Sequence, residues 1–253
     1  MRRLFFDIET GFNLCAVWKT GYNITVPHEA IIKEAGIICI AYKWEGQNKV
    51  YHLEWDKNQD DKTMLQKFVK IAEQADELVA HNGDNFDIKW VRTRCYYHQI
   101  PVMPYFTTID TLKAARSNFR FNSNKLDYIH KYSGGVGKNH TSFDLWKDIV
   151  MKKSTKAMKI MTDYCKQDVV ILEDTYQKMR PYLKPKSSIA EYKCDCSHCG
   201  SSNIRVKSYK VSAAGVKYVQ VQCFDCGQYQ KVNAKSFGNS MKQKAVDISK
   251  RKK

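Results

Sequence analysis

Residues 4–9 of the chain are Leu4-Phe5-Phe6-Asp7-Ile8-Glu9. These β-favouring residues predict a strand, and strand side chains alternate between the two faces of a sheet. Phe6 and Ile8 are therefore expected to face the core. Asp7 and Glu9 are expected together on the other face, where two carboxylates repel each other unless a cation lies between them. Mg²⁺ and Mn²⁺ prefer carboxylate oxygen, so the pair is a candidate metal site, although most such pairs are solvated surface acids.

The pattern around this strand predicts an α/β fold with a mixed sheet. Further strands are expected at residues 35–42, 49–54, 77–81 and 107–109. Helices are expected at residues 62–75, 85–98, 124–132, 141–151 and 154–180. Three strands are thus followed by alternating helices and strands and then by helices, which is typical of a layered sheet flanked by helices.

Two further motifs place acids on helices. Residues 81–87, HNGDNFD, lie where a strand passes into a helix, so Asp87 falls in the first helical turn. An acid at that position is also a common helix cap. Residues 164–168, YCKQD, lie inside the last helix, and residues four apart share a helix face, so Tyr164 and Asp168 can reach one point. An ordinary helix surface is the alternative interpretation of that pair.

Taken in order, these motifs resemble those of the 3′–5′ exonucleases of the DEDD superfamily, which have an RNase H-like fold. FDIET (residues 6–10), HNGDNFD and YCKQD are similar to the three exonuclease motifs, and the likeness covers residues 1–180. The second motif resembles that of the proofreading domain of family B DNA polymerases, which commonly have tyrosine where this chain has His81. The third motif fits the tyrosine subclass, because the histidine subclass would need histidine at Asp163.

The resemblance implies that two divalent cations, Mg²⁺ or Mn²⁺, support phosphodiester hydrolysis at these acids. It assigns Asp7 to both cations. Glu9 and Asp168 are assigned to the cation beside the attacking hydroxide, and Asp87 to the other cation through water. Two such cations can stabilise both the attacking and the leaving oxygen.

The same resemblance implies roles for three more residues. Tyr164 would orient the attacking water, and Asn82 would contact the terminal nucleotide. Asp110 lies in a segment that also resembles the family, and it is expected to be structural rather than catalytic. The implied products are nucleoside 5′-monophosphates released from a 3′ end.

Charge and composition favour a nucleic-acid partner. The chain has 42 Lys and Arg residues against 26 Asp and Glu, and residues 181–253 alone have 15 basic against 4 acidic, a net +11. Such a basic segment favours a polyanion. No apolar run is long enough to cross a membrane, and the acid at position 7 argues against a signal peptide. A cytoplasmic protein of bacterial or viral origin is expected, or a nuclear one if the source is eukaryotic.

A cluster of cysteines near the carboxyl end predicts a zinc ribbon. Two CxxC pairs supply four thiolates, which suit one structural Zn²⁺: Cys196, Cys199, Cys223 and Cys226. Strands are expected at residues 203–209 and 217–222, and Gly200 and Gly227 ease the turn after each pair. Cys194 could replace Cys196, and His198 could compete as a ligand. The ribbon is expected to bind nucleic-acid backbone or, alternatively, a protein partner.

These patterns divide the chain into four parts. An RNase H-like exonuclease domain is expected at residues 1–182, a linker at 183–192 and the ribbon at 193–235. Lysine dominates and apolar residues are sparse in residues 236–253, which are expected to be a disordered basic tail.

The expected function is that of a stand-alone exonuclease, because no polymerase domain follows the motifs. The polymerase-like second motif favours DNA, with single-stranded 3′ ends preferred, and a role in DNA replication or repair. An exoribonuclease of the same superfamily is the near alternative. A non-catalytic nucleic-acid-binding module would have a broken set of acids, whereas this set is complete. A proofreading subunit that acts in trans with a DNA polymerase is also compatible with the sequence.

Overall fold

The computed structural model describes residues 2–104, 106–137, 141–184 and 188–251. The chain divides into two compact units, Met1–Tyr176 and Gln177–Lys253. This division falls inside the last helix of the predicted exonuclease domain, before the expected boundary at residue 182. Residues 185–187 of the predicted linker lie outside the described residues. Within the described ranges, no helix has the length and apolar character needed to cross a bilayer.

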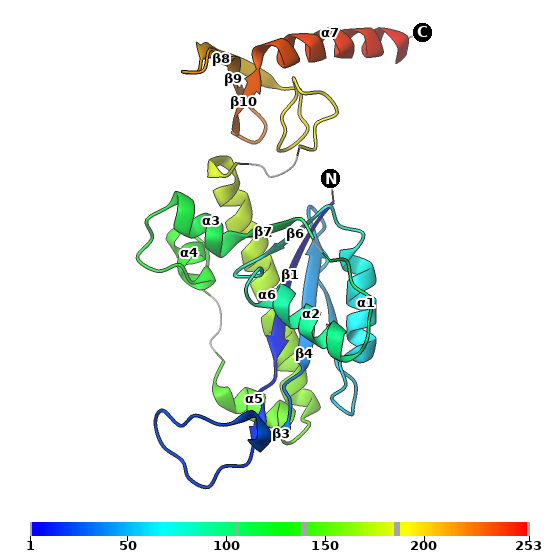
Figure 1. Ribbon diagram of the computed structural model, residues 1–253, viewed down its shortest axis with the longest axis vertical. Helices are drawn as coiled ribbons and strands as arrows, with labels where there is room; N and C mark the ends of the chain where they lie inside the picture. Colours follow the sequence, from blue (N-terminus) through cyan, green and yellow to red (C-terminus); the bar gives the residue numbers. More distant parts are fainter. Residues whose placement is uncertain (1, 105, 138–140, 185–187, 252–253) are drawn as a thin grey trace. The chain divides into compact units, whose positions relative to one another are not determined.

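A mixed five-stranded sheet forms the centre of the first unit, with the strand order β5-β4-β1-β6-β7 (Figure 1). Its strands are β1 (Arg3–Thr10), β4 (Ile37–Trp44), β5 (Tyr51–Glu54), β6 (Glu77–Ala80) and β7 (Thr108–Asp110). The central strand β1 runs antiparallel to β4 and parallel to β6. All five strands lie where the sequence predicts strands, so the predicted mixed sheet is confirmed.

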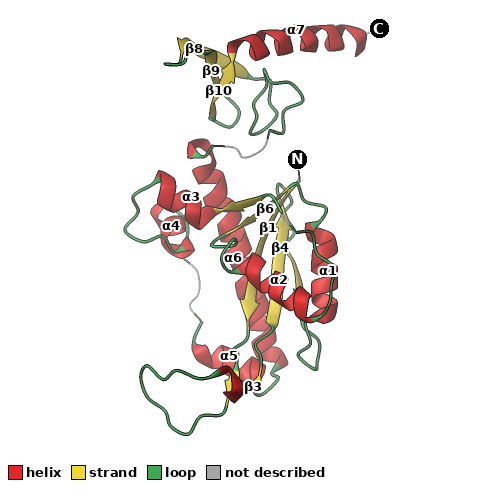
Figure 2. Ribbon diagram, viewed as in Figure 1, coloured by secondary structure: helices red, strands yellow, loops and turns green. Residues whose placement is uncertain are grey.

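Helices cover both faces of this sheet, as expected for an α/β fold (Figure 2). The helices of the first unit are α1 (Lys62–Ala72), α2 (Asp87–Tyr97), α3 (Thr111–Asn118), α4 (Leu126–Tyr132), α5 (Phe143–Val150) and α6 (Thr155–Met179), of which α1 and α2 cover one face and α6 the other. Phe6 and Ile8 of β1 pack with buried apolar residues of α1 and α2. On the other face Phe5 contacts Tyr176 of α6, with ring centroids 5.5 Å apart. Alternation along β1 therefore directs its acids toward the α6 side of the sheet.

Residues 11–36, between β1 and β4, contain short elements that the sequence analysis did not predict. β2 (Leu14–Cys15) and β3 (Ile31–Lys33) form a two-stranded sheet, and the 3₁₀ turn η1 (His28–Ala30) precedes β3. These elements have few buried residues, so local hydrophobic periodicity gives little sign of them.

The second unit contains a three-stranded antiparallel sheet with the order β10-β9-β8. Its elements are the 3₁₀ turn η2 (Arg180–Tyr182), β8 (Ile204–Val211), β9 (Lys217–Cys223), β10 (Tyr229–Asn233) and the helix α7 (Ala234–Arg251). The strands β8 and β9 were predicted, whereas β10 and α7 were not. The small core beneath this sheet includes Val219, Val221 and Phe237.

Residues 236–253 were expected to be disordered, and that prediction is wrong for the described part of the segment, which lies in α7 (Ala234–Arg251). The side-chain oxygen of Asn233 caps the helix by accepting backbone N–H bonds at 3.0 and 3.1 Å. Phe237 packs into the ribbon core, and Lys244 forms an ion pair at 2.5 Å with a buried carboxylate of the ribbon. A cap and one buried aromatic residue thus anchor a helix whose other side chains are mostly charged or polar.

Candidate active site and zinc site

The first two motifs meet at the carboxyl end of β1, where the neighbouring strand has ended. The strand β6 pairs with β1 only from Arg3 to Phe5, and its chain then leaves the sheet toward α2. The N–H of Ile8 therefore donates to a side chain, the carboxylate Oδ1 of Asp87, at 3.2 Å. This hydrogen bond holds the acid of the second motif beside the strand that carries Asp7.

Acids of the first and third motifs form a cluster. One carboxylate oxygen from each of Asp7, Glu9 and Asp168 lies within 4.8 Å of the others. Asp168 lies on α6 and is 6% exposed. Asp87 is not a member of this three-residue group, and its link to the cluster is the bond to Ile8. The structure thus brings three of the four predicted metal ligands into one group and places the fourth alongside.

The electrostatics of this cluster favour a bound cation. Burial raises the pKa of Asp7 well above its ordinary value, and the charges of Asp87, Glu9 and Asp168 raise it further. Burial also raises the pKa of Asp87 to about 7, although hydrogen bonds from its own backbone and from Ile8 oppose the rise. A cation stabilises carboxylate anions that otherwise repel one another. An all-carboxylate set of oxygen donors fits Mg²⁺ or Mn²⁺.

A thiol that the sequence analysis did not single out also belongs to this site. The Cys165 sulfur lies 3.4 Å from the carbonyl oxygen of Asp7 and 3.6 Å from its carboxylate Oδ2. Cys165 is fully buried between Tyr164 and Asp168 on α6, and Tyr164 itself is half-buried. The position of Cys165 within the YCKQD motif could have indicated this contact. Cys165 lies close to the helix face that carries Asp168, and that face is expected near β1.

The second motif is held in place by a structural acid. Asn82 has a left-handed backbone, with a φ of 68°, and its N–H donates to Asp110 Oδ1 at 3.0 Å. The same Oδ1 accepts from the N–H of Leu112 at 2.9 Å, so Asp110 caps α3. This role agrees with the prediction that Asp110 is structural.

An open cavity of about 650 Å³ borders the acid cluster. Its lining includes Asp7 and Asp168, together with Asn82 of the second motif. Arg116 and Lys125, from the segment around α3 and α4, add positive charge to the same wall. The cavity therefore combines carboxylates that can hold cations with basic groups that can bind phosphate.

His81 connects this cavity to the next part of the chain. Its Nε2 donates to the carbonyl oxygen of Asn124 at 2.9 Å, and its Nδ1 lies 2.9 Å from Thr111 Oγ1. Thr111 begins α3 and Asn124 precedes α4, so one side chain ties the end of β6 to both helices. In the sequence, His81 was notable only as a departure from the polymerase motif.

Comparison with known proteins identifies the family. The RNase H superfamily model matches residues 32–180, which is more than half of the chain. The chain belongs to the RNase H superfamily. The matched range includes the second and third motifs, and β1, which carries the first, is the central strand of the same sheet.

Two DNA polymerases are similar to this RNase H superfamily chain. A DNA polymerase of Thermococcus hydrothermalis is 28% identical over 105 residues, or 38% of this chain and 5% of that protein. The family B DNA polymerase of the hyperthermophilic archaeon Pyrobaculum calidifontis has a TM-score of 0.55 at 16% identity, covering 71% of this chain and 24% of the polymerase. The chain thus spans a small part of the length of each polymerase, and the structural likeness shows a shared fold.

The four cysteines predicted to bind zinc come together in the second unit: Cys196, Cys199, Cys223 and Cys226. Their sulfurs lie within 4.8 Å of one another, and the Cys196–Cys226 and Cys199–Cys223 sulfur pairs are each 3.6 Å apart. Zn–S bonds of about 2.3 Å in a tetrahedron separate the sulfurs by roughly 3.8 Å, so the set fits Zn²⁺. Four protein ligands leave no open position, as in structural sites, and the cluster fits a small zinc ribbon.

The turns around these cysteines also agree with the sequence analysis. Gly200 and Gly227 each have a φ of 73°, the left-handed region that favours glycine. Among the described residues the alternative ligands stay outside the four-sulfur group. Cys194 is buried in the ribbon core beside Val219, and His198 is buried with its carbonyl accepting from Arg180 at 2.7 Å.

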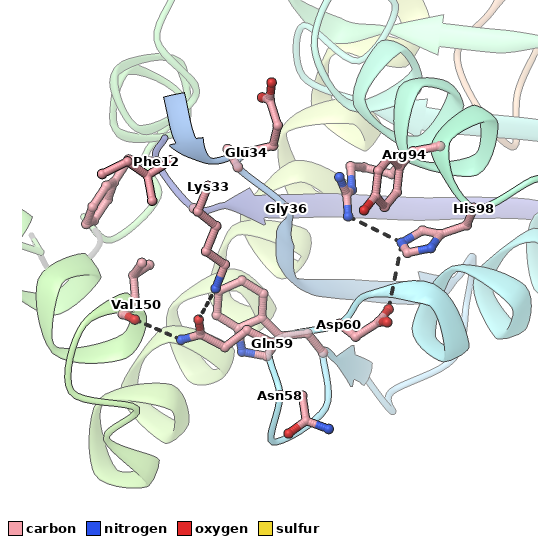
Figure 3. A pocket seen from close by; sticks show the side chains of 15 residues that line it. Phe12, Lys33, Glu34, Gly36, Asn58, Gln59, Asp60, Arg94, His98 and Val150 are labelled. Carbon is pink, nitrogen blue, oxygen red and sulfur yellow. Dashed lines mark hydrogen bonds and ion pairs between the residues drawn. The ribbon is translucent and has the colours of Figure 1, made fainter. Parts of the chain in front are cut away.

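A second acidic cluster, which the sequence did not reveal, borders another cavity (Figure 3). It contains Asp60, Asp61 and His98. Arg94 donates to both carboxylate oxygens of the buried Asp61 at 2.8 and 2.9 Å. The N–H of Ile37 donates to Asp61 at 2.9 Å, and His98 lies 2.6 Å from it. Because a guanidinium already neutralises this carboxylate, the cluster fits an ion pair that ties α1 and α2 to β4.

Replacing Arg94 with alanine is expected to lower the free energy of unfolding by about 3–5 kcal/mol, because the buried Asp61 loses its cation.

Burial raises the pKa of Asp61, but hydrogen bonds from Arg94, Ile37 and His98 hold it below its ordinary value. Asp61 therefore stabilises the fold above its unfolded pKa of about 3.9, and less as pH falls through the lower folded pKa.

Denaturant unfolding of the wild type and of Asp61→Asn checks the pH dependence. The stability difference between the two proteins is expected to be constant above about pH 5 and to shrink below about pH 4. A difference that stays constant across this range would show that the Asp61 charge does not stabilise the fold.

Proposed function

We propose that this chain is a metal-dependent 3′–5′ exonuclease that releases nucleoside 5′-monophosphates from DNA 3′ ends. The observation that carries the proposal is the acid cluster. Carboxylate oxygens of Asp7, Glu9 and Asp168 lie within 4.8 Å of one another. The carboxylate of Asp87 accepts a hydrogen bond from the N–H of Ile8, the residue between Asp7 and Glu9. Membership of the RNase H superfamily supports a nuclease, and the tyrosine-type third motif supports the exonuclease class.

Each residue of the site would have its own role in the reaction. Asp7, Glu9 and Asp168 would hold two divalent cations, with Asp87 supporting the second from its buried position. When bound, these cations supply positive charge that acidifies water and stabilises the charge developing at phosphorus. Tyr164 would orient the attacking water by a hydrogen bond, and Asn82 would contact the terminal nucleotide from the cavity wall.

DNA is the substrate that the comparisons favour. The two proteins compared above are DNA polymerases, one of them of family B. An exoribonuclease of the same superfamily is the alternative. The complete set of acids supports an enzyme over a non-catalytic binding module. A proofreading role in trans with a DNA polymerase would use the same site with a separate partner.

The zinc ribbon would bind nucleic-acid backbone. β8 is an edge strand, and the basic side chains on and next to it are exposed: Arg205, Lys207, Lys210 and Lys217. Lysine and arginine in such an array neutralise phosphates without reading sequence. A protein partner such as a polymerase is the alternative occupant.

The test uses 5′-labelled single-stranded DNA and RNA of one sequence, incubated with the full chain and Mg²⁺ or Mn²⁺. The expected result is a ladder that shortens from the 3′ end of DNA and is absent when a chelator removes the divalent cations. Faster shortening of RNA would favour the exoribonuclease. Tight, salt-sensitive binding without cleavage of either polymer would refute the enzyme and leave the binding module.

A further inference from the structure

Four aromatic side chains gather on the segment that joins α3 to α4, and we call them the aromatic platform: Phe119, Phe121, Tyr128 and Tyr132. Phe119 and Phe121 are stacked, with ring centroids 5.0 Å apart and planes inclined by 17°. Tyr132 meets Phe121 edge-on at 5.4 Å and stacks with Tyr128 at 6.2 Å. The four rings thus form one continuous group that extends from the loop after α3 onto α4.

Burial in the hydrophobic core does not account for this group. Tyr132 is 70% exposed, and the other three rings are partly exposed. None of the four belongs to the core that β1 forms with α1 and α2. Contiguous apolar surface that remains open to solvent is typical of a binding site.

The segment that carries the platform also contributes residues to the wall of the active-site cavity. Arg116 and Lys125 line the cavity that contains Asp7 and Asp168, and the two phenylalanines lie between them in the chain. The bond from His81 to the Asn124 carbonyl fixes this segment against the end of β6. A strand whose 3′ end lies at the acids would therefore pass the segment that carries the platform.

The charge around the platform fits a polyanion. Arg116, Arg120 and Lys125 are exposed, and none of them has an ion pair within the described part of the chain. By contrast, Lys131 pairs with Asp127 at 2.8 Å. Aromatic rings on which bases stack, bordered by cations that neutralise phosphates, are the features by which proteins hold unpaired nucleic acid.

We propose that the aromatic platform binds the unpaired nucleotides that precede the one being removed. This inference rests on the proposed function, since it assigns a 3′ end to the acid cluster. Paired bases in a duplex cannot stack on these rings, so the platform selects single strands. Because every base has a stacking face, the selection is independent of sequence.

The test compares two single-stranded substrates, a dinucleotide and a dodecanucleotide, in the full chain and in Tyr132→Ala. Loss of one stacking ring costs about 1–3 kcal/mol, so the preference for the longer substrate, as a ratio of kcat/KM values, is expected to fall about tenfold. Tyr132→Phe keeps the ring and is expected to restore the preference. Tyr96→Ala is the matched control, because Tyr96 is 90% exposed on α2, outside the platform.

Binding without cleavage separates this inference from the proposed function. Fluorescence anisotropy of a labelled dodecanucleotide, without divalent cations, is expected to show about tenfold weaker binding by Tyr132→Ala than by the wild type. Equal binding and equal length preference in the two proteins would overturn the platform while the exonuclease stands. A wild type that binds in this way but cleaves neither substrate would refute the enzyme and retain the platform.

Discussion

Replacing Asp7 with asparagine is expected to lower kcat/KM for single-stranded DNA by about a thousandfold or more. Asparagine keeps the size of the side chain but removes the charge at the centre of the acid cluster. Cation charge in such sites is worth several kcal/mol of transition-state stabilisation, and 1.36 kcal/mol is a factor of ten in rate. Release of nucleoside monophosphates from a labelled strand measures the loss.

Thermal unfolding separates this loss from misfolding. Burial and repulsion raise the pKa of Asp7, so its anion is unfavourable in the metal-free fold. The neutral variant is therefore expected to unfold at the same temperature as the wild type, or at a higher one, when divalent cations are absent. Asp144→Asn is the matched control, because Asp144 is 78% exposed on α5 and pairs with Lys147. Full activity of Asp7→Asn would contradict the proposed site.

Replacing Cys223 with serine is expected to remove zinc and to unfold the second unit. Structural Zn²⁺ in small domains contributes apparent binding free energies of about 10–16 kcal/mol. That amount exceeds what a core of this size can supply, since the core has few large buried side chains. Metal analysis of the full chain is expected to give one zinc per wild-type molecule and none for the variant.

Limited proteolysis of the same two proteins reports on folding. Cleavage in the variant is expected within residues 188–251, while the first unit, which has its own core, resists. Cys194→Ala is the control, because this buried thiol lies outside the four-sulfur group and its loss is expected to leave zinc in place. Zinc content unchanged in Cys223→Ser, or lost in Cys194→Ala, would show that the ligand set is wrong.

The sequence alone predicted those features that depend on local pattern. The five strands of the first unit appear as short apolar or alternating runs, because a strand in a layered fold buries one or both faces. The acid motifs and the two CxxC pairs were visible because their chemistry depends on short, regular spacings. Asp110 was expected to be structural, and in the fold its carboxylate caps α3.

Other features depended on contacts that no local pattern records. The helix α7 was missed because most of its side chains are polar or charged, yet the Asn233 cap, the packing of Phe237 and the Lys244 ion pair anchor it. The role of His81 depends on Asn124, 43 residues further along the chain. The aromatic platform likewise depends on the turn between α3 and α4, which brings Phe121 against Tyr132.

The sequence by itself therefore determined which side chains are candidates for catalysis or metal binding, namely the acids of the three motifs and the four cysteines. The tertiary structure decided which of them meet. Asp168 reaches Asp7 because α6 packs against the face of the sheet opposite α1 and α2. Asp87 reaches Ile8 because β6 ends early and leaves the N–H of Ile8 without a strand partner. Distances between residues far apart in the chain are set by packing, which many weak contacts decide together.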